Sequence, residues 1–204
     1  MAGPPEEFQG CTGVEKMKIA LAADHVGFAL KEKIREYLKN KGLEVEDHGP
    51  SNSEPVDYPD FAEKVAAQVA AKQADYGVLV CGTGIGMMIA ANKVPGIRAA
   101  AANDTISARL AREHNNANVL TLGGRMIDEA SMHQIVDTWL STPFAGGHHE
   151  RRVEKIDAID QRYHLEKKVW ALPSLYVHAP CAKLTLKSPR PSTRKLTAKR
   201  GRWS

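Results

Sequence analysis

The sequence predicts an α/β fold: a three-layer α/β/α sandwich around a doubly wound, five-stranded parallel sheet of Rossmann-like type, with a C-terminal helix. Short apolar runs of strand length alternate with segments in which apolar residues recur at helical spacing, a pattern typical of parallel sheets. Of the 204 residues, 43% are hydrophobic and 6% aromatic, as in an ordinary globular protein. This length suits one domain with a short appendage.

Five short apolar runs predict the strands. The first is apolar enough for a strand that is buried on both faces. The five runs are KIALAAD (18–24), LEVEDHG (43–49), GVLVCG (77–82), IRAAAA (97–102) and NVLTLGG (118–124).

Apolar stripes at helical spacing predict one helix after each strand and a final helix at 149–164. The first stripe ends at Gly42, a residue that commonly follows a helix C-terminus. The stripes, in chain order, are Leu30, Ile34, Tyr37 and Leu38; Phe61, Val65 and Val69; the segment 85–93; Ile106 and Leu110, ending near His114; Met132, Ile135, Val136, Trp139 and Leu140; and Val153, Ile156, Ile159 and Tyr163.

Charge and composition divide the chain into three parts. Residues 1–16 lack periodicity and are predicted to be a disordered leader, whereas residues 17–166 form the predicted domain. Residues 167–204 hold ten Lys or Arg and no Asp or Glu, so the net charge of +4 is +10 from this segment and −6 from the rest. With four prolines and no sustained period, the segment is predicted to be a basic flexible extension.

The sequence predicts a cytoplasmic protein without a membrane span or metal site. No stretch is apolar enough to cross a bilayer, and the first residues lack the pattern of a secretory signal. Cys11, Cys81 and Cys181 are odd in number and have no paired spacing. They indicate neither a disulfide framework nor a zinc site, which fits a reducing compartment.

Residues able to do chemistry gather where the predicted strands end, the edge at which doubly wound sheets bind ligands. Two further groups stand at a helix end and at the start of the last helix. The groups are Asp24-His25, Cys81 to Gly86, His114-Asn115, Gly123 to Arg125, and His148 to Arg152.

The loop after Cys81 is the strongest of these signals. Its three glycines allow a tight turn whose N–H groups converge on a phosphate or a developing oxyanion. The loop is neither a P-loop, since no Lys-Ser/Thr follows Gly86, nor a GxGxxG dinucleotide motif. A thiol near such amide donors and a helix N-terminus has its thiolate stabilised, so Cys81 is a candidate base. The alternative is a structural turn with an inert core cysteine.

The other groups have structural alternatives too. Asp24-His25 could cap the helix that is expected near Val26. His114 could complement the dipole at a helix C-terminus. Arg151 and Arg152 oppose the dipole at the start of a helix, which a bound anion would explain. Their shared location at one edge of the sheet favours a functional site.

Five segments, at 22–31, 56–62, 80–100, 111–125 and 146–156, match a known family. They resemble the ribose-5-phosphate isomerase B family, which also includes galactose-6-phosphate and allose-6-phosphate isomerases. The resemblance runs from about Met17 to Tyr163. It implies an aldose–ketose isomerase without metal or other cofactor that interconverts ribose 5-phosphate and ribulose 5-phosphate. The segments are AADHVGFALK (22–31), VDYPDFA (56–62), VCGTGIGMMIAANKVPGIRAA (80–100), AREHNNANVLTLGGR (111–125) and GGHHERRVEKI (146–156).

The resemblance also implies residue roles. Cys81 is the proton acceptor, His114 the donor that opens the furanose ring, and Thr83 lies near the sugar oxygens. The family is at least dimeric, so a homodimer or tetramer is expected, with His114 facing Cys81 of the neighbouring subunit. The expected substrate-binding residues are Asp24, His25, Gly82, Gly84, Ile85, Gly86, Asn115, Arg125, His148 and Arg152.

The sequence departs from the family pattern at two positions. One branch of the family has a glutamate base where this chain has Met87, which places the chain in the cysteine branch. Many members have an arginine where this chain has His148, and histidine is a weaker phosphate partner.

Two alternative functions stay open at this point. The same chemistry could act on allose 6-phosphate, galactose 6-phosphate or a tetrose phosphate. Alternatively, the basic extension could bind nucleic acid, although its aromatic residues are sparse and no known binding module is present.

Overall fold

The structure is a computed structural model and describes residues 16–170, with side chains up to Tyr163. Five parallel strands form one sheet in the order β2-β1-β3-β5-β4. The fold class predicted from the sequence is therefore confirmed. The strands are β1 (Lys18–Ala23), β2 (Glu44–Asp47), β3 (Tyr76–Cys81), β4 (Ala99–Ala101) and β5 (Val119–Gly123).

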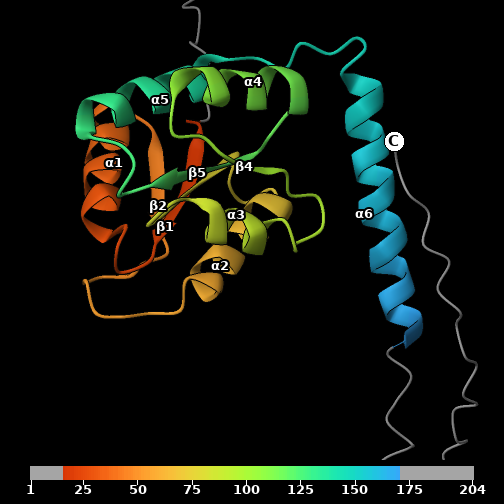
Figure 1. Ribbon diagram of the computed structural model, residues 1–204, viewed down its shortest axis with the longest axis horizontal. Coiled ribbons are helices and arrows are strands. Elements are labelled where there is room, and N and C mark those ends of the chain that lie inside the picture. Colours follow the sequence, from red (N-terminus) through yellow and green to blue (C-terminus); the bar gives the residue numbers. More distant parts are fainter. Residues whose placement is uncertain (1–15, 171–204) are drawn as a thin grey trace, which may run out of the picture. The chain divides into compact units, whose positions relative to one another are not determined.

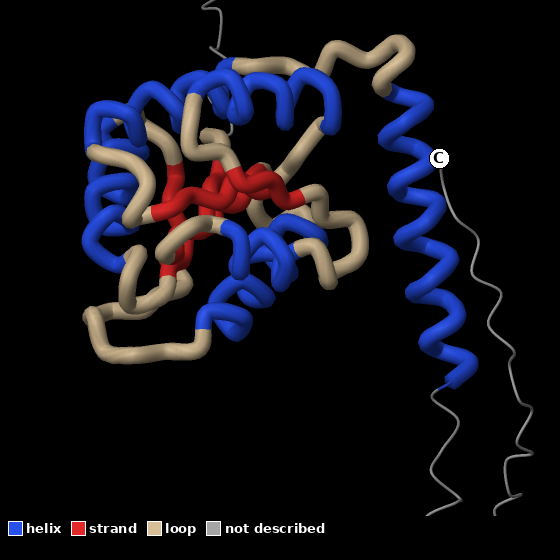
Figure 2. Tube along the Cα trace, in the orientation of Figure 1, coloured by secondary structure: helices blue, strands red, loops and turns tan. Residues whose placement is uncertain are grey.

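Helices cover both faces of the sheet (Figures 1 and 2). α1, α4 and α5 pack on one face around the buried Trp139, and α2 and α3 pack on the other face around Met87. The helices are α1 (Phe28–Asn40), α2 (Tyr58–Ala70), α3 (Ile85–Ala91), α4 (Thr105–Asn115), α5 (Glu129–Ser141) and α6 (Glu150–Trp170).

The strand order fixes where a ligand can bind. From β1 the chain first builds outward to β2 and then crosses to β3 on the other side, so the order reverses between β1 and β3. In doubly wound sheets, ligands bind in a crevice outside the carboxyl ends of the strands at such a reversal. Residues 24 and 25 follow β1 there, and Cys81 ends β3.

Three elements differ from the sequence-based expectation. α1 begins at Phe28 rather than near Val26, and the edge strand β4 is only three residues long, shorter than the predicted run 97–102. α6 continues to Trp170, six residues beyond the predicted end. Its charged composition favours helix even without an apolar face to bury, which apolar periodicity cannot detect.

Only the first residue of the predicted apolar stripe of α6 is buried. Val153 is buried, whereas Ile156, Ile159 and Tyr163 are exposed. Two contacts join the helix to the loop before β4: the Arg98 guanidinium pairs with Asp157 (3.0 Å), and the Gly96 N–H donates to Asp160 (2.8 Å).

The leader (1–16) and the basic extension (167–204) lie almost entirely outside the described residues. The domain boundaries therefore stay predictions. Within residues 16–170, no helix is both long and apolar enough to cross a membrane.

Candidate active site

The loop after β3 encloses the Cys81 thiol. Cys81 is the last residue of the strand and is only 5% exposed, and its Sγ accepts a hydrogen bond from the Gly84 N–H (3.2 Å). Gly84 has φ +82°, a conformation that a residue with a side chain rarely adopts. A Cβ there would also lie 3.2 Å from backbone atoms of β5. Glycine is therefore required for the turn that aims this N–H at the sulfur.

The end of β5 supports the same loop. Cys81 and Gly123 are register partners in the sheet, and the chain continues from Gly123 alongside the loop. The Gly124 N–H donates to the Cys81 carbonyl (2.7 Å), and the Arg125 N–H donates to the Gly82 carbonyl (3.1 Å). The Arg125 Nη1 lies 3.6 Å from the position of a Cβ on Gly82. A guanidinium group thus stands beside the glycine loop, where it can bind an anion bidentately.

The other loop residues line the same turn. The Thr83 hydroxyl is exposed and accepts from the Ile85 N–H (3.3 Å). Gly86 faces the Tyr58 ring at the start of α2, since a Cβ on Gly86 would lie 2.9 Å from the Tyr58 Cζ. Tyr58 is a site-lining residue that the sequence analysis missed, although it belongs to the segment 56–62 that carried part of the resemblance.

The residues after β1 complete this group. The buried Asp24 carboxylate accepts from the Gly27 N–H (2.7 Å) and so stabilises the turn that leads into α1. The His25 Nδ1 accepts from the Val56 N–H (3.4 Å). In a neutral ring that accepts at Nδ1, the proton is on Nε2, which can then donate to a ligand oxygen.

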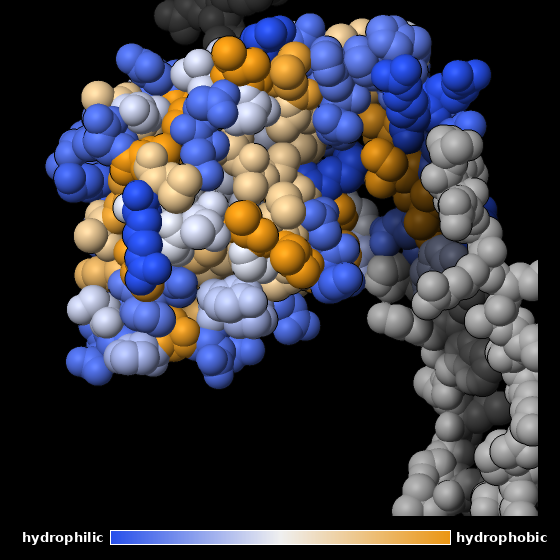
Figure 3. Space-filling model, in the orientation of Figure 1, coloured by the Kyte–Doolittle hydropathy of each residue, from blue (hydrophilic) through white to orange (hydrophobic). Residues whose placement is uncertain are grey.

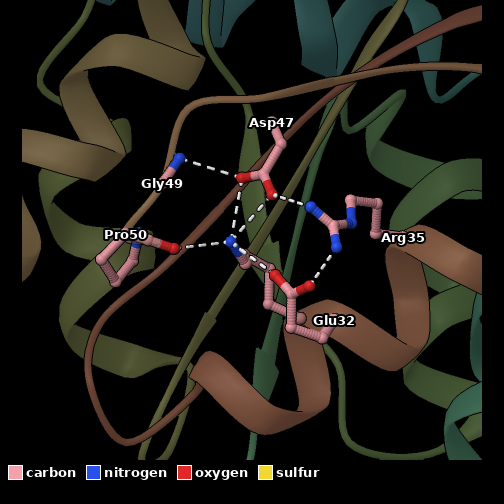
Figure 4. Close-up of polar contacts among 6 residues, drawn as sticks. Glu32, Arg35, Asp47, Gly49 and Pro50 are labelled. Carbon is pink, nitrogen blue, oxygen red and sulfur yellow. Dashed lines mark hydrogen bonds and ion pairs between the residues drawn. The ribbon is translucent and has the colours of Figure 1, made fainter. Parts of the chain in front are cut away.

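A buried lysine holds the loop that contacts His25 (Figure 4). Lys31 is 1% exposed, and its Nζ donates to both Asp47 carboxylate oxygens (3.0 and 2.8 Å) and to the Pro50 carbonyl (2.7 Å). A buried ammonium needs such partners because unpaired burial of a charge is costly. The network ties the segment after β2 to α1, and this segment continues to Val56.

A second group forms where α4 ends and α6 begins. The His114 ring stacks on the His149 ring, with centroids 4.1 Å apart and an interplanar angle of 9°. The His148 ring also contacts His149, with centroids 3.8 Å apart and an interplanar angle of 40°. The Ala145 N–H donates to the Glu113 carbonyl (3.0 Å) and fixes the connecting segment against the end of α4.

His149 lies within the predicted group His148 to Arg152, but the sequence analysis gave it no role. It is 9% exposed, and its burial, followed by the positive charges of His148, His114 and Arg152, lowers its pKa below the usual value. The ring is therefore mostly neutral at neutral pH and can stack on His114 without charge repulsion.

The predicted site residues thus fall into two groups. Within residues 16–170, no hydrogen bond, ion pair or ring contact joins the Cys81 group to the His114 group. In the same part of the chain, no three His, Cys, Asp or Glu side chains are placed to hold one metal ion. The Cys81 group is Asp24, His25, Cys81, Gly82, Thr83, Gly84, Ile85, Gly86 and Arg125, and the His114 group is His114, Asn115, His148 and Arg152.

Comparison with known proteins identifies the family. Residues 19–156 match the family model described as Ribose/Galactose Isomerase. Ribose-5-phosphate isomerase B of Escherichia coli K12 is 49% identical over 145 residues, which cover 71% of this chain and 97% of that protein.

Solved structures agree. Ribose-5-phosphate isomerase B of Clostridium thermocellum is 50% identical, with a TM-score of 0.71 over 72% of this chain and 99% of that one. A ribose 5-phosphate isomerase from Thermotoga maritima is 57% identical, with a TM-score of 0.69 over 71% and 99%. These matches confirm the resemblance found in the sequence. The chain belongs to the ribose/galactose isomerase family, in the group of the type B ribose-5-phosphate isomerases.

Proposed function

We propose that this chain interconverts ribose 5-phosphate and ribulose 5-phosphate, with Cys81 as the base. One observation carries the proposal: the Cys81 sulfur lies at the sheet crevice within hydrogen-bond distance of a loop amide, with the Arg125 guanidinium beside the same loop. A proton abstraction next to a carbonyl needs a base, an oxyanion site and an anchor for the phosphate. The loop and its neighbours supply all three.

The reaction proceeds by two proton transfers between carbon and Cys81 and one between the two oxygens of the enediolate. The Cys81 thiolate removes the C2 proton of the open aldose, and the electron pair of the C–H bond moves to form an enediolate with negative charge on O1. The N–H groups of residues 82–86 and the Thr83 hydroxyl stabilise this charge. A proton then passes from O2 to O1, the C2 carbonyl forms, and the thiol returns its proton to C1, which gives the ketose and restores the thiolate.

A homodimer is part of the proposal, because the acid that opens the sugar ring belongs to the second group of residues. His114 of one subunit then serves Cys81 of the other. Exposed apolar residues beside the loop support this arrangement: Ile85 and Ile89 are each 52% exposed on α3, and Met126 follows β5. Figure 3 shows apolar surface over α3. Burial of these side chains against a second copy removes them from water.

The phosphate is assigned to the positively charged residues. Arg125 belongs to the Cys81 group and Arg152 to the His114 group, so the anion also bridges the two subunits. His25 contributes through Nε2, and His148 takes the place of an arginine. The sugar phosphate substrate and the cytoplasmic location are proposals that rest on the family and on the sequence.

A panel of sugar phosphates tests the substrate. We expect the highest kcat/KM for ribose 5-phosphate, with lower values for allose 6-phosphate, galactose 6-phosphate and erythrose 4-phosphate. Unphosphorylated ribose is the control. Its kcat/KM is expected to be at least about 10³-fold lower than that of ribose 5-phosphate, because it cannot form charge-assisted hydrogen bonds to the arginines. If a six-carbon sugar phosphate had the highest kcat/KM, it would replace ribose 5-phosphate as the proposed substrate. Failure to convert any of these compounds would overturn the proposal.

A further inference from the structure

Three successive carbonyl groups, at the end of β3 and in the loop that follows, accept hydrogen bonds from groups near the carboxyl end of β5. The N–H groups of Gly124–Arg125 donate to the carbonyls of Cys81 (2.7 Å) and Gly82 (3.1 Å). The third carbonyl, that of Thr83, accepts instead from a side chain, the Nδ2 of Asn103 (3.4 Å). Two of these supports are thus backbone groups that any sequence would supply, whereas the third depends on one side chain.

These bonds determine the direction of the loop amides. In a trans peptide the carbonyl of one residue and the N–H of the next point in opposite directions. Carbonyls that face β5 therefore turn the N–H groups of residues 82–84 to the opposite side, where the thiol lies. The hydrogen bond from the Gly84 N–H to the Cys81 Sγ (3.2 Å) shows this for the third peptide, Thr83–Gly84.

Asn103 is itself held in a defined orientation. It lies two residues after β4, and its Oδ1 accepts from the Gly123 N–H (2.8 Å). Because the oxygen is engaged there, the NH₂ end of the amide is turned toward Thr83. The space is tight, since a Cβ on Gly123 would lie 3.0 Å from the Thr83 Cα.

We infer that Asn103 is a positioning residue for the isomerase reaction, which fixes the Thr83–Gly84 peptide so that the Gly84 N–H stabilises the Cys81 thiolate. The inference rests on the proposed role of Cys81 as base. Asn103 does not need to touch the sugar. It acts through one peptide group, and its loss frees that peptide to rotate away from the sulfur.

Asn103→Ala tests the inference in a chain that also carries Cys11→Ser and Cys181→Ser, so that Cys81 is the only thiol. We expect kcat to fall about tenfold, with KM within about twofold, since one hydrogen bond to a charged group is lost. Independently of turnover, the rate of alkylation by iodoacetamide is measured at pH 7 and at pH 9.5. The ratio of the two rates reports the thiolate fraction and cancels accessibility. This ratio is expected to fall about fivefold or more.

Asn92→Ala is the matched control. Asn92 bridges backbone groups in the same way, with Nδ2 donating to the Ala99 carbonyl (2.9 Å) and Oδ1 accepting from the Ala99 N–H (2.8 Å), but it lies at the far end of α3 from the thiol. Its loss is expected to lower stability and to leave the alkylation ratio unchanged. An equal fall of the alkylation ratio in Asn103→Ala and Asn92→Ala would show that the effect comes from a general loss of stability. That result would overturn the inference.

A second variant covers the case in which Asn103→Ala does not fold. Asn103→Asp keeps the acceptor for the Gly123 N–H and removes only the donor to Thr83. Because its added charge also disfavours a thiolate, the assay is repeated in 1 M NaCl, which screens that charge. If the alkylation ratio of Asn103→Asp stays low in 1 M NaCl, the inference is supported. If the ratio returns to the wild-type value in salt, the inference is overturned. If Cys81→Ala remained active, the proposed function would fail instead, irrespective of Asn103.

Discussion

Cys81→Ala is expected to lower kcat/KM for ribose 5-phosphate by at least about 10³-fold. The change removes the only group in the proposal that takes and returns the carbon-bound proton, and a positioned base contributes about 10² to 10⁴-fold. The fold should persist, because the loss of one buried sulfur costs on the order of 1 kcal/mol. Turnover is measured with ribose 5-phosphate, and folding by circular dichroism and thermal unfolding.

Two further variants make this result specific. Cys81→Ser keeps the size and hydrogen bonding of the side chain but is a poor base, so it is expected to be nearly as inactive as alanine. The double variant Cys11→Ser/Cys181→Ser retains Cys81 and is expected to keep wild-type kcat/KM. If Cys81→Ala kept more than about a tenth of wild-type activity in a folded protein, the assignment of the base would be wrong.

A heterodimer of one Cys81→Ala subunit and one His114→Ala subunit is expected to recover about half of the wild-type activity, although each variant alone is inactive. In a shared site, one of the two sites of this heterodimer combines the intact Cys81 of one subunit with the intact His114 of the other. The two variants are co-expressed with different tags and purified over both tags, so that only heterodimers are assayed.

The matched control carries both substitutions in one chain, paired with a wild-type chain. If the sites are shared, one of the two sites then lacks Cys81 and the other lacks His114. This heterodimer is therefore expected to be inactive. If each chain instead built its site alone, the outcome would invert: the first heterodimer would be inactive, and the second would keep half of the activity. That inversion would contradict the dimeric site.

The fold was largely predictable because the central strands β1, β3 and β5 and the helices α1, α2 and α5 bury most of their apolar residues. The stripes of α2 and α5 are buried as expected, around Val65 and Trp139. The prediction was less complete for α4, where Ile106 is exposed, and for α6, where Ile156 and Ile159 are exposed within the single chain. Periodicity in one sequence reports that a face is apolar, but it does not report whether its partner is another segment or a second subunit.

The candidate site was predictable at positions where the residue type has few structural roles other than the one proposed. Glycines at 82, 84 and 86 after a buried strand indicate a turn of converging amides, and the contact between Cys81 and Gly84 is of this kind. Tyr58 was missed, and His149 was given no role, because aromatic and histidine side chains also serve as ordinary packing residues. Asn103 was missed for a different reason: its role depends on the strand order, which places the end of β4 beside β5.

Hydrogen exchange at C2 of ribose 5-phosphate in D₂O measures the abstraction step itself, separately from ring opening and product release. The proposal holds that a thiolate removes this hydrogen as a proton. Because the thiol can exchange its proton with D₂O before it returns one to carbon, wild-type protein should introduce deuterium at C2 of recovered substrate, and Cys81→Ala should introduce none above the uncatalysed rate. Exchange by Cys81→Ala at the wild-type rate would show that another group removes the proton.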